Sequence, residues 1–231
     1  MKLDWRESYR IIYSRYPFVG IFDRIADPAD LEAVSEIERR TNDRIRDEID
    51  ALSLVRPGDR IAGPGATAIM ASFTHAKPSR FSDGFFGVYS ATKHLDAAIA
   101  ESRFHVEAFY RATVEPSTDI DMRVYEASIR GHFDDLLSLA FEDPVLDPES
   151  YARSRPYGRA VYDADELDGI AYRSVRDQKH RPAAACFRPR VVSNCHPHSY
   201  LLYRWDGIRQ AITDVARRET LEGFVLSRRA F

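Results

Sequence analysis

The segment from Ser79 to His105, SRFSDGFFGVYSATKHLDAAIAESRFH, constrains this chain more than any other. It begins with Arg80 at a glycine-containing turn, continues through a short apolar run centred on Tyr89, and ends in a predicted helix that carries Glu101. Loop, strand and helix in this order bring an arginine, a phenol and a carboxylate toward one cleft. Arginine binds phosphate and a carboxylate stabilises a nearby cation, so the cleft suits a phosphorylated ligand that develops positive charge when it reacts.

The predicted helix runs from about His94 to Tyr110, and Glu101 shares a face with Ala97 and His105, each four residues away. Small residues beside Glu101 allow the helix backbone to approach a sheet closely. A solvent-facing glutamate more often has long polar neighbours, so we treat Glu101 as a candidate functional residue. His105 either orients Glu101 or packs at the helix end.

Length and composition favour a single folded domain. The chain has 231 residues, of which 44% are hydrophobic and 12% aromatic, and this content is enough to bury a core. We expect one domain over residues 1–231, with an N-terminal arm and helices in 1–75, the core motifs in 76–192, and a C-terminal strand and helix in 193–231. The sequence contains no internal repeat, low-complexity tract or linker.

The charge pattern and the apolar runs argue against nucleic acid and membranes as direct partners. The formal net charge is -3 and no block of like charges appears, which is not the pattern of a DNA-binding protein. No apolar run approaches the roughly 20 residues that span a bilayer, and the start MKLDWRESYR lacks the apolar core of a signal peptide. We therefore expect a cytoplasmic protein.

The two cysteines, Cys186 and Cys195, are fewer than a secreted disulfide scaffold of this length would use. We expect both to be reduced thiols, with a disulfide as the alternative. The run Cys195-His196-Pro197-His198 lacks the paired spacing of a zinc site, so no metal site is predicted.

Hydrophobic periodicity and turn signals predict an alternation of strands and helices. Strands are predicted over residues 9–12, 88–90, 122–129, 170–176, 183–192 and 201–205. Helices are predicted from residue 27 onward and over residues 44–52, 94–110, 133–141, 147–167 (with a kink or restart at 156–158) and 207–222. The apolar run 66–74 is compatible with a helix or a strand, and we favour a short helix. In the strand after Asp168-Gly169, the side chains of Ile170, Tyr172 and Ser174 share one face. The Ser174 hydroxyl needs a partner there, and a backbone group is the simplest one.

Four blocks of the sequence resemble the Arg, Glu and Ser blocks of the RES domain family. They are Ser79-Arg80-Phe81, Gly87-Val88-Tyr89-Ser90-Ala91, Ala98-Ile99-Ala100-Glu101 and Asp168-Gly169-Ile170-Ala171-Tyr172-Arg173-Ser174. The resemblance covers roughly Tyr9 to Arg190 and rests on the order and spacing of the blocks. Two positions depart from the family pattern: Arg173 stands where the family usually has proline, and Ser102 where this subgroup usually has threonine.

The resemblance implies an α+β, ADP-ribosyltransferase-like fold, in which mixed β-sheet halves with flanking helices form a cleft for NAD. It also implies the toxin of a type II toxin–antitoxin system, which consumes NAD as a substrate without a further cofactor. Such a toxin is held inactive by a cognate antitoxin, typically an Xre-like helix-turn-helix protein. The oligomeric state, including a homo-oligomer, is left open.

The family also implies roles for particular residues. Glu101 would stabilise the positive charge that forms on the ribose, and Arg80 would hold the pyrophosphate. Tyr89 would stack on the nicotinamide ring, and Ser174 would fix the nicotinamide ribose. Arg10 is a candidate for a second phosphate contact, or else a surface arginine beside an edge strand.

Three activities remain open at this level. The first is cleavage of the nicotinamide–ribose bond with water or phosphate as acceptor. The second is transfer of ADP-ribose to a protein. The third is a non-catalytic, partner-binding module of the same fold, and the presence of all four residue types in the blocks argues against it.

Overall fold

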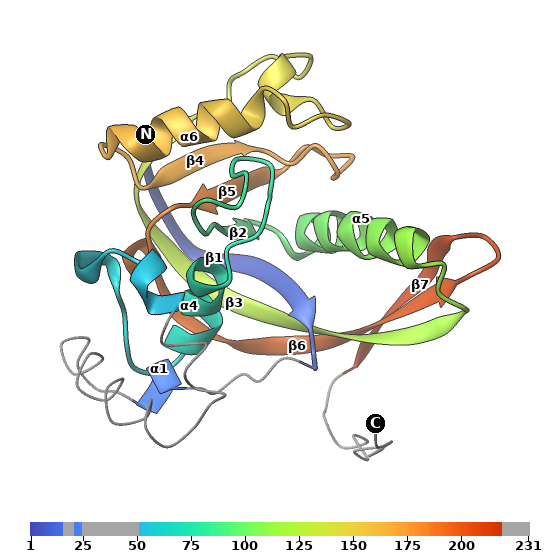
Figure 1. The fold of residues 1–231 in the computed structure, drawn as a ribbon. Coiled ribbons are helices and arrows are strands. Elements are labelled where there is room, and N and C mark those ends of the chain that lie inside the picture. Colours follow the sequence, from blue (N-terminus) through green and yellow to red (C-terminus); the bar gives the residue numbers. More distant parts are fainter. Residues whose placement is uncertain (16–20, 25–50, 219–231) are drawn as a thin grey trace.

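The structure is a computed structural model that describes residues 1–15, 21–24 and 51–218 (Figure 1). It is a single α+β domain built on one mixed sheet. The strands are β1 (Lys2–Tyr13), β2 (Tyr89–Thr92), β3 (Thr118–Asp135), β4 (Gly169–Arg173), β5 (Pro182–Cys186), β6 (Val192–Asp206) and β7 (Ala211–Arg218). The helices are α1 (Ile21–Arg24), α4 (Ala66–Thr74), α5 (Leu95–Thr113) and α6 (Ser154–Ala164), with short 3-10 helices at Ala51–Leu54, Pro57–Asp59, Pro144–Leu146 and Pro189–Val191.

The seven strands follow the order β1-β2-β5-β4-β3-β6-β7, and β1 also pairs with β3. Five strands therefore form a closed ring of pairings, from which β6 and β7 extend. The β3–β4 pair is parallel and the other pairs are antiparallel. This arrangement confirms the predicted mixed sheet with flanking helices.

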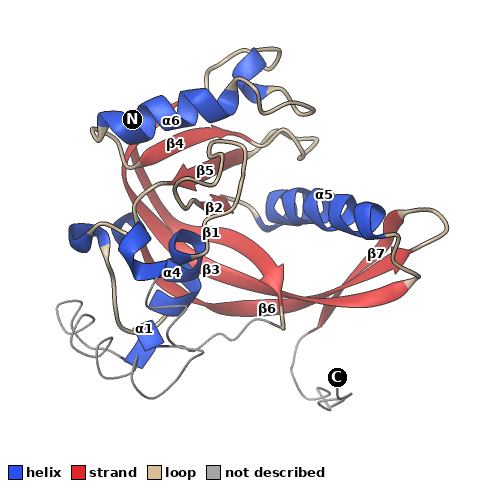
Figure 2. Ribbon diagram, in the orientation of Figure 1, coloured by secondary structure: helices blue, strands red, loops and turns tan. Residues whose placement is uncertain are grey.

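The helices pack on different faces of the sheet and define three buried clusters. Helix α4 packs with the inward side chains of β1 to β5, whereas α6 packs on the other face of β4 and β5. Helix α5 covers β3, β6 and β7 together with part of β1. Figure 2 shows α6 above β4 and α5 beside β2, with α4 on the far side of the strands from α6.

Several elements form where the sequence predicts them. Helix α4 has the predicted bounds, α5 contains most of the predicted helix, and each of the six predicted strands overlaps an observed one. The predicted helix from residue 27, and most of the one at 44–52, fall outside the described residues.

Two predicted helices are wrong. Residues 133–135 complete β3, because they pair in parallel with β4, and the segment after them is irregular as far as the 3-10 helix at Pro144–Leu146. Residues 211–218, predicted as part of a C-terminal helix, form β7 against β6. The helix predicted over residues 147–167 is only partly present: residues 147–153 are not helical, and α6 covers Ser154–Ala164 without a restart at 156–158. Pro156 lies in its first turn, where a missing N–H costs no helical hydrogen bond.

No helix among the described residues is long and apolar enough to cross a membrane.

Candidate active site

The loop that carries Arg80 is fixed by its own hydrogen bonds. The Ser79 N–H donates to the Ser82 carbonyl oxygen at 2.8 Å, and the Ser82 hydroxyl donates to the Phe86 carbonyl oxygen at 2.7 Å. Arg80 is only 8% exposed, and its Nη1 donates to the backbone oxygen of Asp147 at 2.8 Å. The guanidinium is therefore held by a neutral acceptor.

Helix α6 supports the same loop through a glycine. A Cβ atom at Gly158 would lie 2.1 Å from the carbonyl oxygen of Phe81, so only glycine permits this approach of helix and loop. The Phe81 ring in turn meets the Tyr172 ring edge-on, with centroids 5.1 Å apart. Arg80 is thus anchored between α6 and β4.

Glu101 and Ser174 form a direct pair between α5 and the end of β4. The Ser174 hydroxyl donates to Oε1 of Glu101 at 2.6 Å, and Ser174 is fully buried. The same hydroxyl accepts the N–H of Asp177 at 3.1 Å. The expected backbone partner is therefore present, but the proton of the hydroxyl goes to the carboxylate, which fixes its orientation.

An ion-pair chain ties the Ser174 loop to the start of α5. Arg181 donates to Asp177 at 2.7 Å and to Asp96, in the first turn of α5, at 2.8 Å. The Arg181 guanidinium lowers the pKa of the Asp177 carboxyl well below its usual range. These contacts fix the position of the segment after β4 relative to α5, the helix that carries Glu101.

Tyr172 links Arg80 and Glu101 in one site: its ring meets that of Phe81, the residue after Arg80, and Ser174, two residues further along the chain, donates to Glu101. Burial, and then the Glu101 carboxylate, raise the pKa of the Tyr172 phenol far above its usual value, while Arg80 opposes the rise. Loss of hydration, and then the charges of Arg176 and Arg80, lower the pKa of His105, while Glu101 opposes this fall. The lowered pKa favours the neutral imidazole at pH 7.

The structure does not bring Tyr89 and Arg10 to this site. Tyr89 is completely buried and pairs with Cys186 on the face of the sheet that packs against α4. The Arg10 guanidinium lies 4.8 Å from the Tyr89 ring centroid and donates to the Ser90 carbonyl oxygen at 3.1 Å, so it supports β2 from that side. Strand alternation places Ser90, not Tyr89, on the face of Tyr172.

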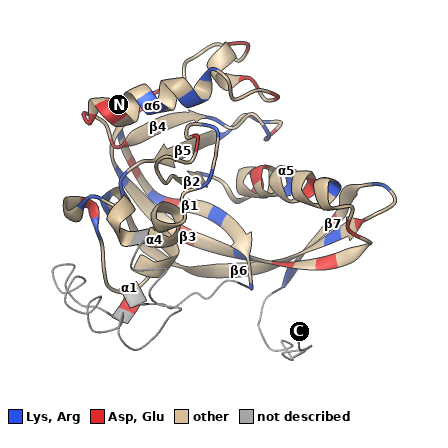
Figure 3. Ribbon diagram, in the orientation of Figure 1, with Lys and Arg blue, Asp and Glu red and all other residues tan. Residues whose placement is uncertain are grey.

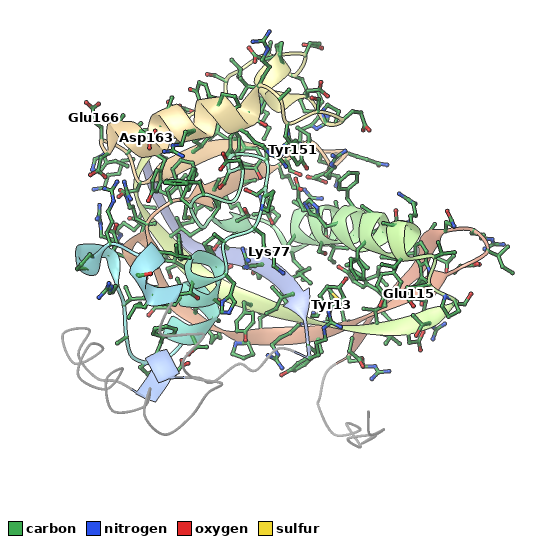
Figure 4. All side chains as sticks on the ribbon, viewed as in Figure 1. Tyr13, Lys77, Glu115, Tyr151, Asp163 and Glu166 are labelled. Atoms are coloured by element: carbon green, nitrogen blue, oxygen red, sulfur yellow. The ribbon has the colours of Figure 1, made fainter. Side chains whose placement is uncertain are left out.

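The phenol beside Arg80 and Glu101 is Tyr172. The sequence contained the signal for it, because Tyr172 and Ser174 are two residues apart on one strand and therefore share a face. No sequence signal pointed to Tyr151, an aromatic residue before α6, whose ring centroid lies 4.7 Å from the Arg80 guanidinium. Figure 4 labels Tyr151 between α6 and α5, on the same side of the molecule as the α5 helix.

Both cysteines are free and buried. Burial raises the pKa of Cys195 to about 11 and that of Cys186 further. Both therefore stay protonated at pH 7, and neither suits the role of a nucleophile.

Comparison with known proteins places these residues in a family context. A family model described as RES domain matches residues 58–206, more than half of the chain, and this range includes Arg80, Glu101 and Ser174. The chain is also similar to an uncharacterized protein, y4oC, of Sinorhizobium fredii. The two are 28% identical over 212 residues, which cover 88% of this chain and 84% of that protein.

Proposed function

Because the chain belongs to the RES domain family, known from toxin–antitoxin systems, we propose that it is an enzyme that consumes NAD. The reaction is cleavage of the bond between nicotinamide and ribose, with water or phosphate as acceptor. The C–N bond breaks with its electron pair leaving on neutral nicotinamide. The acceptor oxygen then bonds to the ribose carbon, and a water acceptor releases one proton to the solvent. No strong general acid is needed for such a leaving group.

The observation that carries this proposal is the Glu101–Ser174 pair with Arg80 in the same site. Glycosidic bond cleavage passes through an oxocarbenium-like state, which is positive at the sugar. Glu101 supplies a negative charge that stabilises the positive sugar, and the 2.6 Å hydrogen bond from Ser174 holds the carboxylate in a fixed orientation. A pre-oriented carboxylate stabilises the transition state more than the neutral ground state, which is the condition for a faster reaction.

Arg80 supplies the anion contact. One of its nitrogens is used by the Asp147 carbonyl oxygen, which leaves the rest of the planar guanidinium to bind a phosphate. Ser174 contributes by orienting Glu101: it is fully buried, and its hydroxyl already donates to the Glu101 carboxylate.

The test is NAD consumption by purified protein, comparing wild type with Glu101→Gln. The substitution keeps the size of the side chain and removes its charge, so we expect the rate to fall at least ~100-fold, about the cost of one transition-state stabiliser. Glu166→Gln is the matched control, because Glu166 is exposed and lies at the opposite end of α6 from Tyr151 (Figure 4). Equal rates in wild type and Glu101→Gln would remove Glu101 from the mechanism.

RES domains are typically paired with an antitoxin. We propose an Xre-like helix-turn-helix partner for this chain. Expression of the chain alone should arrest growth, and co-expression of the partner should restore it. The Glu101→Gln variant should not arrest growth, since the arrest follows from loss of NAD. Growth arrest by Glu101→Gln at the wild-type level would separate toxicity from NAD cleavage.

A further inference from the structure

A broad open pocket of about 900 Å³ is lined by residues that neighbour Glu101 and Ser174 in the chain, among them Arg176, two residues after Ser174. Its walls come from the loop before β2, from α5, from the loop after β4 and from the segment that leads into α6. His105, one turn after Glu101 on α5, is among the lining residues, so the pocket continues from the site described above. Figure 3 shows basic positions along α6 and on the connection after β4.

Tyr151 lines this pocket and is shared by two guanidinium groups. Arg80 lies 4.7 Å and Arg155 lies 5.3 Å from the centroid of its ring. Arg155 is in the first turn of α6, and its Nε donates to the Ser79 carbonyl oxygen at 3.1 Å, in the loop that carries Arg80. The two arginines are therefore positioned by the same loop and the same ring.

Neither Arg80 nor Arg155 has a carboxylate partner among the described residues, unlike Arg159 and Arg176, which line the pocket together with Arg155. Arg176 contacts Glu149 at 3.5 Å, donates to the Pro148 carbonyl oxygen and lies over the Phe104 ring. Arg159 is paired with Asp163 at 2.7 Å.

Arg80 and Arg155, in contrast, each use one nitrogen on a neutral backbone oxygen. Two cations that share one ring without an anion repel each other, and a ligand with two adjacent negative charges would relieve this repulsion. A diphosphate has that charge and also accepts the paired donors of a guanidinium.

We propose that Arg155 binds a diphosphate group together with Arg80, and that the Tyr151 ring fixes the positions of the two guanidinium groups relative to each other. The ligand class is a nucleotide with a diphosphate bridge. This inference rests on the proposed function, since the dinucleotide is its substrate, and it assigns the second phosphate contact to Arg155. Arg10 lies on the other face of the sheet and cannot reach this group.

The test measures binding of ADP-ribose by calorimetry, with adenosine monophosphate as the ligand that lacks the bridge. Arg155→Gln should weaken ADP-ribose binding about 10- to 100-fold, the effect of one lost charge-assisted contact, and should change monophosphate binding less. Arg153→Gln is the matched control, because Arg153 is exposed at the start of the same helix and does not line the pocket. Tyr151→Leu should weaken binding, whereas Tyr151→Phe should restore it, because the ring rather than the hydroxyl contacts both arginines.

The same variants separate this inference from the proposed function. In the NAD assay, Arg155→Gln should raise KM with little change in kcat, because the diphosphate is bound equally before and during bond cleavage. ADP-ribose binding that depends on Arg155, in a protein that does not consume NAD, supports the subsite and refutes the enzyme. Wild-type affinity for ADP-ribose in Arg155→Gln, or equal losses in Arg153→Gln and Arg155→Gln, would overturn the subsite.

Discussion

Replacing Gly158 by alanine sets two opposing effects against each other on α6. Alanine is favoured over glycine inside a helix by ~1 kcal/mol, because the glycine backbone loses more conformational freedom on folding. The added Cβ would, however, lie 2.1 Å from the carbonyl oxygen of Phe81 and 2.7 Å from its Cβ. Carbon and oxygen atoms in contact are usually about 3.3 Å apart or more, so helix and loop must separate by roughly 1 Å.

The steric effect should win. The clashing atoms are two backbone atoms of Phe81 and its Cβ, which is fixed to that backbone, and Phe81 is only 1% exposed, so no flexible side-chain end can move aside. Forcing a methyl group into a packed interior costs ~1–3 kcal/mol, and the fixed loop favours the upper end of that range. Subtracting the helix preference leaves a net destabilisation of ~1–2 kcal/mol, equivalent to a Tm lower by roughly 2–8 °C for a domain of this size.

Thermal unfolding and NAD consumption together form the assay, with Ala160→Gly as the control. Ala160 is exposed on the same helix, so its replacement costs ~1 kcal/mol of helix preference without touching the loop. Both variants should lose stability, but only Gly158→Ala displaces the neighbour of Arg80. A displacement of 1 Å can cost up to ~100-fold in rate, so NAD consumption should fall in Gly158→Ala and stay at the wild-type level in Ala160→Gly.

A Gly158→Ala protein as stable as wild type, or more stable, would refute this reasoning. It would mean that the loop moves freely and that α6 does not anchor Arg80. Equal losses of NAD consumption in Gly158→Ala and Ala160→Gly would refute only the claim that Gly158 helps to position Arg80.

Two further predictions concern the loop after β4. Ser174→Ala removes the donor to Glu101 and leaves the buried Asp177 N–H without its acceptor. The free energy of unfolding, measured by denaturant titration, should therefore fall by ~1–3 kcal/mol. An unchanged midpoint would contradict the described hydrogen bonds. The folded-state pKa of Asp177 is depressed by Arg181, so its contribution to stability is complete above about pH 5 and is lost as the pH falls below its ordinary pKa of about 3.9. Arg181→Met should therefore be less stable than wild type at neutral pH and should lose less stability on acidification, and parallel pH profiles of the two proteins would show that the pair does not contribute.

The sequence alone determined the local elements and the order of the functional blocks. The amphipathic pattern around Glu101 defines helix α5 because short-range spacing is sufficient for it, whereas the apolar run 66–74 favoured a helix without excluding a strand. Strand alternation likewise placed Tyr172 and Ser174 on one face. These features depend only on neighbours along the chain.

Tertiary pairing decided the rest. Ile212 and Val215 are three residues apart, which is a helical spacing. In β7 they nevertheless lie on one face, where Ile212 pairs with Trp205 and Val215 pairs with Tyr203 of β6. An irregularity in the β6–β7 pairing shifts the register between these two pairs. The sequence could not distinguish this from a helix, since a bulge allows a strand to reproduce the same apolar spacing.

The sequence also could not show which face of the sheet carries the site. Alternation shows that Tyr89 and Ser90 point in opposite directions, but not which of them faces Glu101, because that depends on which helix covers each side. The approach of Tyr151 and Arg155 to Arg80 likewise joins segments that are distant in the chain. Such contacts are fixed only when the whole domain packs, so only the tertiary structure could reveal them.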